Sequence, residues 1–140
     1  MYKKILVALE NSETDKTILV HIAKLAKGLG STIILIHVAD GFAARNQKSL
    51  NLAESQEMRE DREYLERCKA EMEANGVPAV VELACGDPKS EIVASAEREK
   101  CDLIAMATHG HGFVKDVVLG SVAEGVRHRT SIPVLMVRAG

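Results

Sequence analysis

The chain has 140 residues, of which 46% are hydrophobic; this excludes a disordered protein and allows one continuous core, so we expect a single domain over residues 1–140. The formal net charge is −2 and no basic stripe with interleaved aromatic residues occurs, which argues against nucleic acid as a partner. No apolar run approaches the roughly 20 residues that span a bilayer. The apolar run after Lys4 has only five residues, too few for a secretory signal. We therefore predict a cytoplasmic protein with no membrane contact.

The first part of the chain alternates a short apolar run with a longer amphipathic one. The run Ile5–Leu9 is apolar throughout and predicts a strand that is buried on both faces. Ser12 is a candidate N-cap, with Asp15 three residues later as in a capping box, and the helix that follows is expected to end near Gly30. Residues 32–38 predict the second strand.

The middle of the chain contains a polar segment, a second amphipathic helix and a third strand. Residues 40–55 are polar and poorly periodic, which predicts a loop. The next residues with helical spacing form one face on which only Asp61 is charged. The members of this face are Met58, Asp61, Leu65, Cys68 and Met72. Asn75-Gly76 is expected to end the helix, and residues 80–84 predict the third strand.

The last part of the chain continues the alternation. Asp87 followed by Pro88 predicts a helix N-cap and its first residue. The apolar run Leu103–Ala107 predicts the fourth strand, residues 121–127 a short helix, and Val134–Val137 the last strand. The three cysteines show no CxxC spacing, so we expect reduced thiols.

Repeated strand–helix alternation predicts an α/β fold: a Rossmann-like, open, parallel sheet of five strands with helices on both faces. We adopt the strand order 3-2-1-4-5 for this sheet. In such sheets, ligands bind beyond the carboxyl ends of the strands, where the strand order reverses. The loops after Leu9 and after Ala107 both lie at carboxyl ends and would be neighbours in this order.

The segment after the fourth strand has the composition of a phosphate-binding loop. It reads Ala107-Thr108-His109-Gly110, then nine residues, then Gly120-Ser121. Glycine allows main-chain N–H groups to approach phosphate oxygens closely. A helix that starts at Gly120-Ser121 would add unpaired donors and a partial positive charge. The loop therefore predicts a nucleotide site.

These residues resemble the universal stress protein family over essentially the whole chain. Its nucleotide-binding branch has a Gly-x2-Gly-x9-Gly-(Ser/Thr) motif after the fourth strand, which Ala107, Gly110, Gly120 and Ser121 match here with alanine at the first glycine. If the backbone at Ala107 is strand-like, as we expect, alanine costs little. The segment from Ile132 to Val137 also resembles the family.

The resemblance implies an adenine-nucleotide site for ATP. The residues implied in binding are Leu9, Glu10, Val38, Met106, Ala107, His109, Gly110, Gly120, Ser121 and Val122. The first two would flank the base and ribose, Val38 and the main chain of Met106 would hold adenine, and the others would surround ribose and phosphates. Glu10 stands where the family usually has aspartate. A Mg²⁺ ion would be held mostly by phosphates and water.

The family also commonly pairs through its last strand, which makes the stretch from Val134 to Arg138 the candidate homodimer edge. An apolar edge strand left unpaired is an aggregation hazard, which supports the same expectation.

Other functions find less support in the sequence. His109 and His111 suggest a metal site, but no further ligand cluster accompanies them, and we predict no metal-binding residues. A slow ATPase would need residues that position water and stabilise the transferring phosphoryl group, and no such set or other catalytic motif is found. A response-regulator receiver needs an acidic pair where Glu10 stands alone. The remaining alternative is a family member that binds no nucleotide and acts through protein contacts. We predict a nucleotide-binding stress-response module without catalytic residues.

Overall fold

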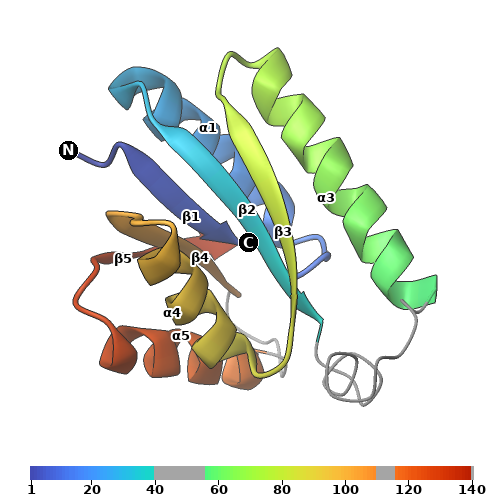
Figure 1. The fold of residues 1–140 in the computed structure, drawn as a ribbon, viewed down its shortest axis with the longest axis vertical. Coiled ribbons are helices and arrows are strands. Elements are labelled where there is room, and N and C mark those ends of the chain that lie inside the picture. Colours follow the sequence, from blue (N-terminus) through green and yellow to red (C-terminus); the bar gives the residue numbers. More distant parts are fainter. Residues whose placement is uncertain (40–55, 110–115, 140) are drawn as a thin grey trace.

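The computed structural model describes residues 1–39, 56–109 and 116–139. Its core is a sheet of five parallel strands in the order β3-β2-β1-β4-β5, which confirms the predicted order (Figure 1). The strands are β1 (Lys4–Ala8), β2 (Thr32–Ala39), β3 (Ala79–Cys85), β4 (Leu103–His109) and β5 (Val134–Ala139). The strand ends differ from the predicted ones by one or two residues. The predicted loop over residues 40–55 lies outside the described residues.

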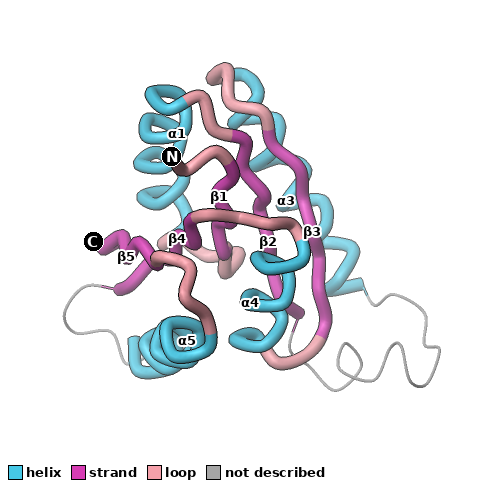
Figure 2. The backbone as a smooth tube through the Cα atoms, turned by 60° about the vertical axis from the view of Figure 1, so that its left-hand side comes forward, coloured by secondary structure: helices cyan, strands magenta, loops and turns pink. Residues whose placement is uncertain are grey.

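The described helices cover both faces of the sheet, as predicted. They are α1 (Asp15–Leu29), α3 (Gln56–Ala74), α4 (Pro88–Arg98) and α5 (Asp116–Arg129). Figures 1 and 2 show α4 and α5 together on one side of the sheet and α1 and α3 on the other. No described helix is long and apolar enough to cross a membrane.

The alternation of side chains along β1 explains these two layers. Ile5 and Val7 belong to the core under α1 and α3, whereas Leu6 belongs to the core under α4 and α5. All three are fully buried, because a parallel strand with helices on both sides has no solvent-facing side. The core is mainly aliphatic, in keeping with an aromatic content of only 3%.

Several predicted helix boundaries are confirmed by their chemistry. Gly30 follows α1 with φ of 69°, and its N–H donates to the carbonyl of Ala26. Asp87 caps α4 by accepting the N–H of Ser90, and Pro88 is the first helical residue. The five predicted apolar-face positions of α3, including Asp61, are all buried.

Two predicted helix starts are wrong. α1 begins at Asp15 after Thr14, and no side-chain hydrogen bond from Ser12 caps it. Instead, the Ser12 hydroxyl lies 2.8 Å from that of Thr14. The last helix starts at Asp116 rather than Ser121, because the sequence from Asp116 onward is itself a good helix start, with an acidic residue followed by an apolar stretch.

Candidate functional site

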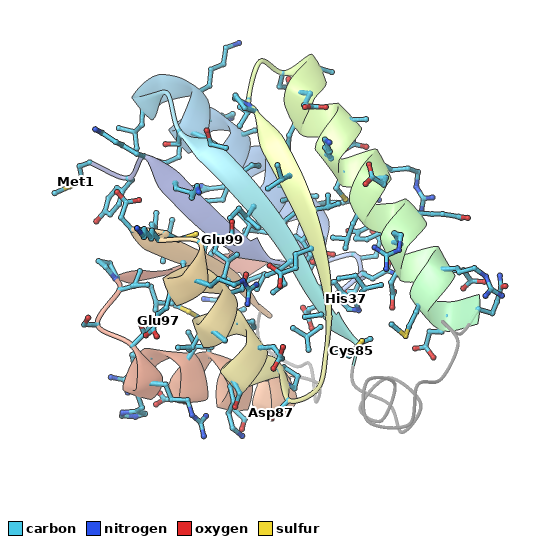
Figure 3. All side chains as sticks on the ribbon, in the orientation of Figure 1. Met1, His37, Cys85, Asp87, Glu97 and Glu99 are labelled. Atoms are coloured by element: carbon cyan, nitrogen blue, oxygen red, sulfur yellow. The ribbon has the colours of Figure 1, made fainter. Side chains whose placement is uncertain are left out.

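The carboxyl ends of β1, β2 and β4 meet at the point where the strand order reverses. β1 lies between β2 and β4, and the chain leaves β1 toward α1 on one face but leaves β4 toward α5 on the other. This divergence opens a crevice that side chains of neither face fill. The structure has a cavity of about 430 Å³ at this point. Figure 3 shows His37 near the carboxyl end of β2 and Asp87 at the start of α4, both at this edge of the sheet.

The cavity is lined by residues from the first, second and fourth strands and from α4 and α5. They are Ala8, Leu9, Glu10, Ile36, His37, Val38, Pro88, Ile92, Met106, Ala107 and Val122. Most of these side chains are apolar, and no lysine or arginine is among them. Such a lining suits a flat apolar group, with polar main-chain atoms at the strand ends to orient it.

Six of the ten predicted site residues line this one cavity. They are Leu9, Glu10, Val38, Met106, Ala107 and Val122. Ala107 lies within β4, is 2% exposed and does not have a positive φ, so its strand-like backbone is confirmed. A side chain at this position of the motif is therefore accommodated without strain.

Of the other four predicted residues, Gly120 and Ser121 are not among the described residues that line the cavity, and nothing tests His109 and Gly110. Gly120 lines a separate hollow of about 200 Å³ between α5 and β5. Ser121 is exposed on α5. His109 is the last residue of β4, but its side chain and all of Gly110 lie outside the described residues.

The true start of α5 changes how the Gly120-Ser121 pair would act. Only the first four N–H groups of a helix lack a partner within the helix. With the helix beginning at Asp116, the N–H groups of Gly120 and Ser121 fall in the second turn and belong to the helical hydrogen-bond ladder. Sequence reasoning misplaced the helix start because serine is a good cap wherever helices begin.

Five lining residues were not predicted: Ala8, Ile36, His37, Pro88 and Ile92. Pro88 was predicted only as the first residue of a helix. The signal that could have found Pro88 and Ile92 is topological, since α4 connects β3 to β4 across the face on which the cavity opens. His37 lines the cavity and is also hydrogen-bonded, with its Nδ1 atom 2.8 Å from the carbonyl oxygen of Leu9.

A buried carboxylate organises the loop between β1 and α1. Asp15 is 1% exposed and accepts the backbone N–H groups of Glu10 at 3.0 Å, Asn11 at 2.8 Å and Ser12 at 3.4 Å. It also accepts the hydroxyl of Tyr64 on α3 at 2.6 Å. Burial raises the pKa of Tyr64 and the bond to Asp15 raises it further, so the phenol remains a donor. These bonds fix the direction in which the chain leaves β1.

The Glu10 side chain is tied to the start of α1. The hydroxyl of Thr14 donates to Oε2 of Glu10 at 2.7 Å. The carboxylate therefore has a defined position at the rim of the cavity, which it also lines. This is the position where the resemblance implies a ribose contact.

His37 connects this loop to α3. Its Nδ1 atom lies 2.8 Å from the carbonyl oxygen of Leu9, and its Nε2 atom lies 3.4 Å from Oδ2 of Asp61. Oδ1 of Asp61 accepts the side-chain amide of Asn11 at 2.8 Å. These residues border a second hollow of about 370 Å³, which is lined mainly by acidic and polar side chains. Within the described residues, no group of three or more His, Cys, Asp or Glu side chains could hold a metal ion.

The fold is a parallel α/β sheet with a cavity at its switch point, and comparison with known proteins defines the family. Residues 1–138 match the universal stress protein family, and the chain belongs to it. The universal stress protein MJ0577 of Methanocaldococcus jannaschii is 32% identical over 155 residues, covering 99% of this chain and 96% of the relative. MJ0531 of the same organism is 34% identical and covers 99% of this chain and 83% of the relative.

Solved structures agree with this assignment. The structure of MJ0577 has a TM-score of 0.83 at 34% identity and covers 100% of this chain and 98% of that one. A universal stress protein from Archaeoglobus fulgidus in complex with dAMP has a TM-score of 0.72 at 20% identity, covering 96% of this chain and 97% of that one. A universal stress protein in complex with cAMP has a TM-score of 0.73 at 18% identity, with 99% and 98% covered. The last two likenesses show the shared fold.

Proposed function

We propose that the chain binds an adenine nucleotide in the cavity at the carboxyl ends of β1, β2 and β4, and acts as a stress-response regulatory module. The observation that carries this proposal is the convergence of six residues, implied independently by the family resemblance, on one cavity. Its volume of about 430 Å³ falls within the range of roughly 300–1,000 Å³ that is usual for small-molecule sites.

The ligands of two structural relatives support the same class of ligand. One universal stress protein was solved with dAMP and another with cAMP. These ligands share adenine and a phosphate. The cavity, which Val38 and Met106 line with apolar side chains, would act as a slot for a purine ring that is packed on its faces and oriented at its edge by main-chain atoms at the strand ends.

We propose ATP as the physiological nucleotide, with Mg²⁺ held mainly by phosphate oxygens and water. Among the described residues that line the cavity there is no lysine or arginine. As the family resemblance implies, main-chain N–H groups after β4 would carry the phosphate contacts. No residue is assigned a catalytic role. Cys68, Cys85 and Cys101 form no disulfide, which is consistent with the reducing cytoplasm that we propose as the location of the protein.

We also propose a homodimer formed through the stretch from Val134 to Arg138. β5 pairs with β4 along one edge and is the last strand of the sheet on the other. Met136 on this strand is 41% exposed, which leaves an apolar side chain at the edge.

The direct test is calorimetric titration of nucleotide-stripped protein with ATP and Mg²⁺, and with AMP, cAMP and GTP in parallel. We expect the adenine nucleotides to bind and GTP to bind much more weakly. Val38→Trp should lower adenine-nucleotide affinity at least tenfold, because the indole would fill the slot. Val80→Trp is the matched control, since Val80 is 49% exposed on the neighbouring strand β3.

Three outcomes would contradict the proposal. Folded wild-type protein that binds none of these nucleotides would favour the member that acts through protein contacts. Equal affinities in Val38→Trp and wild type would show that the nucleotide binds elsewhere. Release of ADP and phosphate during the ATP titration would identify the slow ATPase instead of a purely binding module.

A further inference from the structure

Asp61 is the single charged residue on the buried face of α3. Its carboxylate connects α3 with the β1–α1 loop and with β2. The side chain belongs to α3, its Oδ1 atom accepts the Asn11 amide from the β1–α1 loop at 2.8 Å, and its Oδ2 atom faces Nε2 of His37 on β2 at 3.4 Å. Asp61 is 6% exposed. Burying a carboxylate is costly unless it is paired, so its partners explain its presence among apolar neighbours.

His37 connects Asp61 to Leu9, the residue that follows β1. A carbonyl oxygen only accepts hydrogen bonds, so the Nδ1 atom that lies 2.8 Å from the carbonyl of Leu9 must carry the hydrogen. The ring is thereby oriented by two groups, one at each nitrogen. Leu9 in turn lines the nucleotide cavity.

Asn11 provides the second connection to the same loop. Its φ is 62°, in the left-handed region that non-glycine residues adopt rarely and asparagine more readily than most. Asp15 accepts the Asn11 N–H, and Asp61 accepts its side-chain amide. The loop is therefore held by α1 through the backbone N–H of Asn11 and by α3 through the side chain of Asn11.

Asp61 itself does not line the cavity; it borders the adjacent acidic hollow. Its influence on a bound nucleotide would therefore pass through His37 and Asn11. We propose that Asp61 is a positioning residue of the nucleotide site, which fixes Leu9 and Glu10 as one cavity wall through His37 and Asn11. The inference rests on the proposed nucleotide binding and adds a determinant of affinity that lies outside the cavity.

The competing interpretation is that Asp61 only stabilises the fold. If Asp61 only stabilises the fold, a substitution elsewhere on α3 that lowers the free energy of unfolding should lower nucleotide affinity as well. If Asp61 positions the cavity wall, such a substitution should leave the affinity unchanged. Met72 lies on the same buried face, 2% exposed, near the other end of the helix. Met72→Ala therefore removes buried contacts without touching the β1–α1 loop and is the matched control.

The experiment measures adenine-nucleotide affinity and unfolding for four variants. We expect Asp61→Leu to lower affinity at least tenfold and Met72→Ala to leave it within twofold of wild type. Asp61→Asn should stay within about threefold, because an amide can accept from Asn11 and donate to a neutral His37. Asn11→Gly, which adopts a positive φ freely but lacks the amide, should lower affinity severalfold even if Asp61→Leu fails to fold.

A ligand-free measurement separates this inference from the proposed function. Hydrogen exchange in a peptide covering residues 9–14 should be faster in Asp61→Leu and Asn11→Gly than in Met72→Ala. If the wild type binds nucleotide and the affinity is unchanged in both Asp61→Leu and Asn11→Gly, the positioning role alone is overturned. Loss of affinity that follows stability across all four variants, including Met72→Ala, would also overturn it. Absence of nucleotide binding by the wild type would overturn the proposed function and this inference together.

Discussion

Gly86 and Gly120 show that two glycines of one chain can be present for opposite reasons. Gly86 follows β3 with φ of 132°, and its N–H donates to the carbonyl of Ala39 at 3.1 Å. A Cβ there would meet only ordinary contacts at 3.6 Å or more, so the requirement comes from the backbone. Gly120 lies inside α5 without a positive φ, and no described atom lies within 4 Å of where its Cβ would be.

The two positions should respond to alanine with opposite signs. Gly86→Ala should lower the free energy of unfolding by about 1–2 kcal/mol, because the side chain disfavours that backbone conformation. Gly120→Ala should raise it by about 0.5–1 kcal/mol, because alanine loses less entropy in a helix. Urea unfolding of both variants measures this. If Gly120→Ala is instead less stable than wild type, the position requires glycine for a reason that the described contacts do not explain.

At the scale of elements, α4 is positioned by the chemistry of its first turn. Oδ2 of Asp87 accepts the Ser90 N–H at 3.3 Å and the Ser90 hydroxyl at 2.7 Å. Pro88 and Ile92, which follow directly, line the nucleotide cavity. The hydrogen bonds from Ser90 lower the pKa of Asp87 below its ordinary value of 3.8.

This cap predicts a pH-dependent stability. Asp87→Ala should cost about 1 kcal/mol at neutral pH, the usual value for losing an N-cap. Because the pKa of Asp87 is lowered in the folded chain, the contribution is complete above the ordinary value near 3.8 and is lost as the pH falls through the folded value. Urea unfolding at pH 7 and pH 3 should therefore show a smaller difference at pH 3.

Asp87→Asn is the matched control, since asparagine caps about as well and does not titrate. It should remain close to wild type at pH 7. An Asp87→Ala deficit that is equally large at both pH values would contradict a titrating cap.

The sequence predicted elements whose signals are local. The five predicted strands and the helix start at Asp87-Pro88 are confirmed. Their signals are local, because burial on both faces requires a run of neighbouring apolar residues and a helix cap depends on residues next to one another in the sequence. The six site residues that line the cavity were implied by the family resemblance and not by local sequence patterns. The start of α5 was missed because two helix starts compete in that segment.

The β1–α1 loop could not be predicted for a different reason. Ser12 and Asp15 have the spacing of a capping box, yet Asp15 serves three backbone N–H groups and Tyr64. Asp61 reaches this loop from a helix 50 residues further along the chain. Local spacing carries no information about a partner that only the tertiary fold brings near.

At the scale of the whole molecule, β3 and β5 are the two outer strands of the sheet, and each carries an exposed apolar residue. The N–H of Ile104 donates to the carbonyl of Pro133, in register with Ile104 opposite Val134. In a parallel pair, alternate residues face the neighbour, so the N–H and C=O groups of Met136 point away from β4. At the other edge, Val80 is also an exposed apolar residue.

The proposed homodimer makes these two edges respond differently. Met136→Lys should weaken self-association at least tenfold, because it places like charges on both strands at the interface. Val80→Lys, the matched substitution on β3, should leave association unchanged. Sedimentation equilibrium over a range of concentrations measures both. A monomeric wild type, or association that only Val80→Lys weakens, would refute pairing through β5.

The walls of the nucleotide cavity come from five stretches that span most of the chain: residues 8–10, 36–38, 88–92, 106–107 and 122. Contacts between residues so far apart in sequence form late in folding, because long loops must close first. No fragment shorter than residues 8–122 contains the whole set, and a nascent chain that has not yet delivered α5 lacks the wall that Val122 provides. Ligand capture would thus be a reporter of completed folding, and bound nucleotide would stabilise the molecule as one cooperative unit.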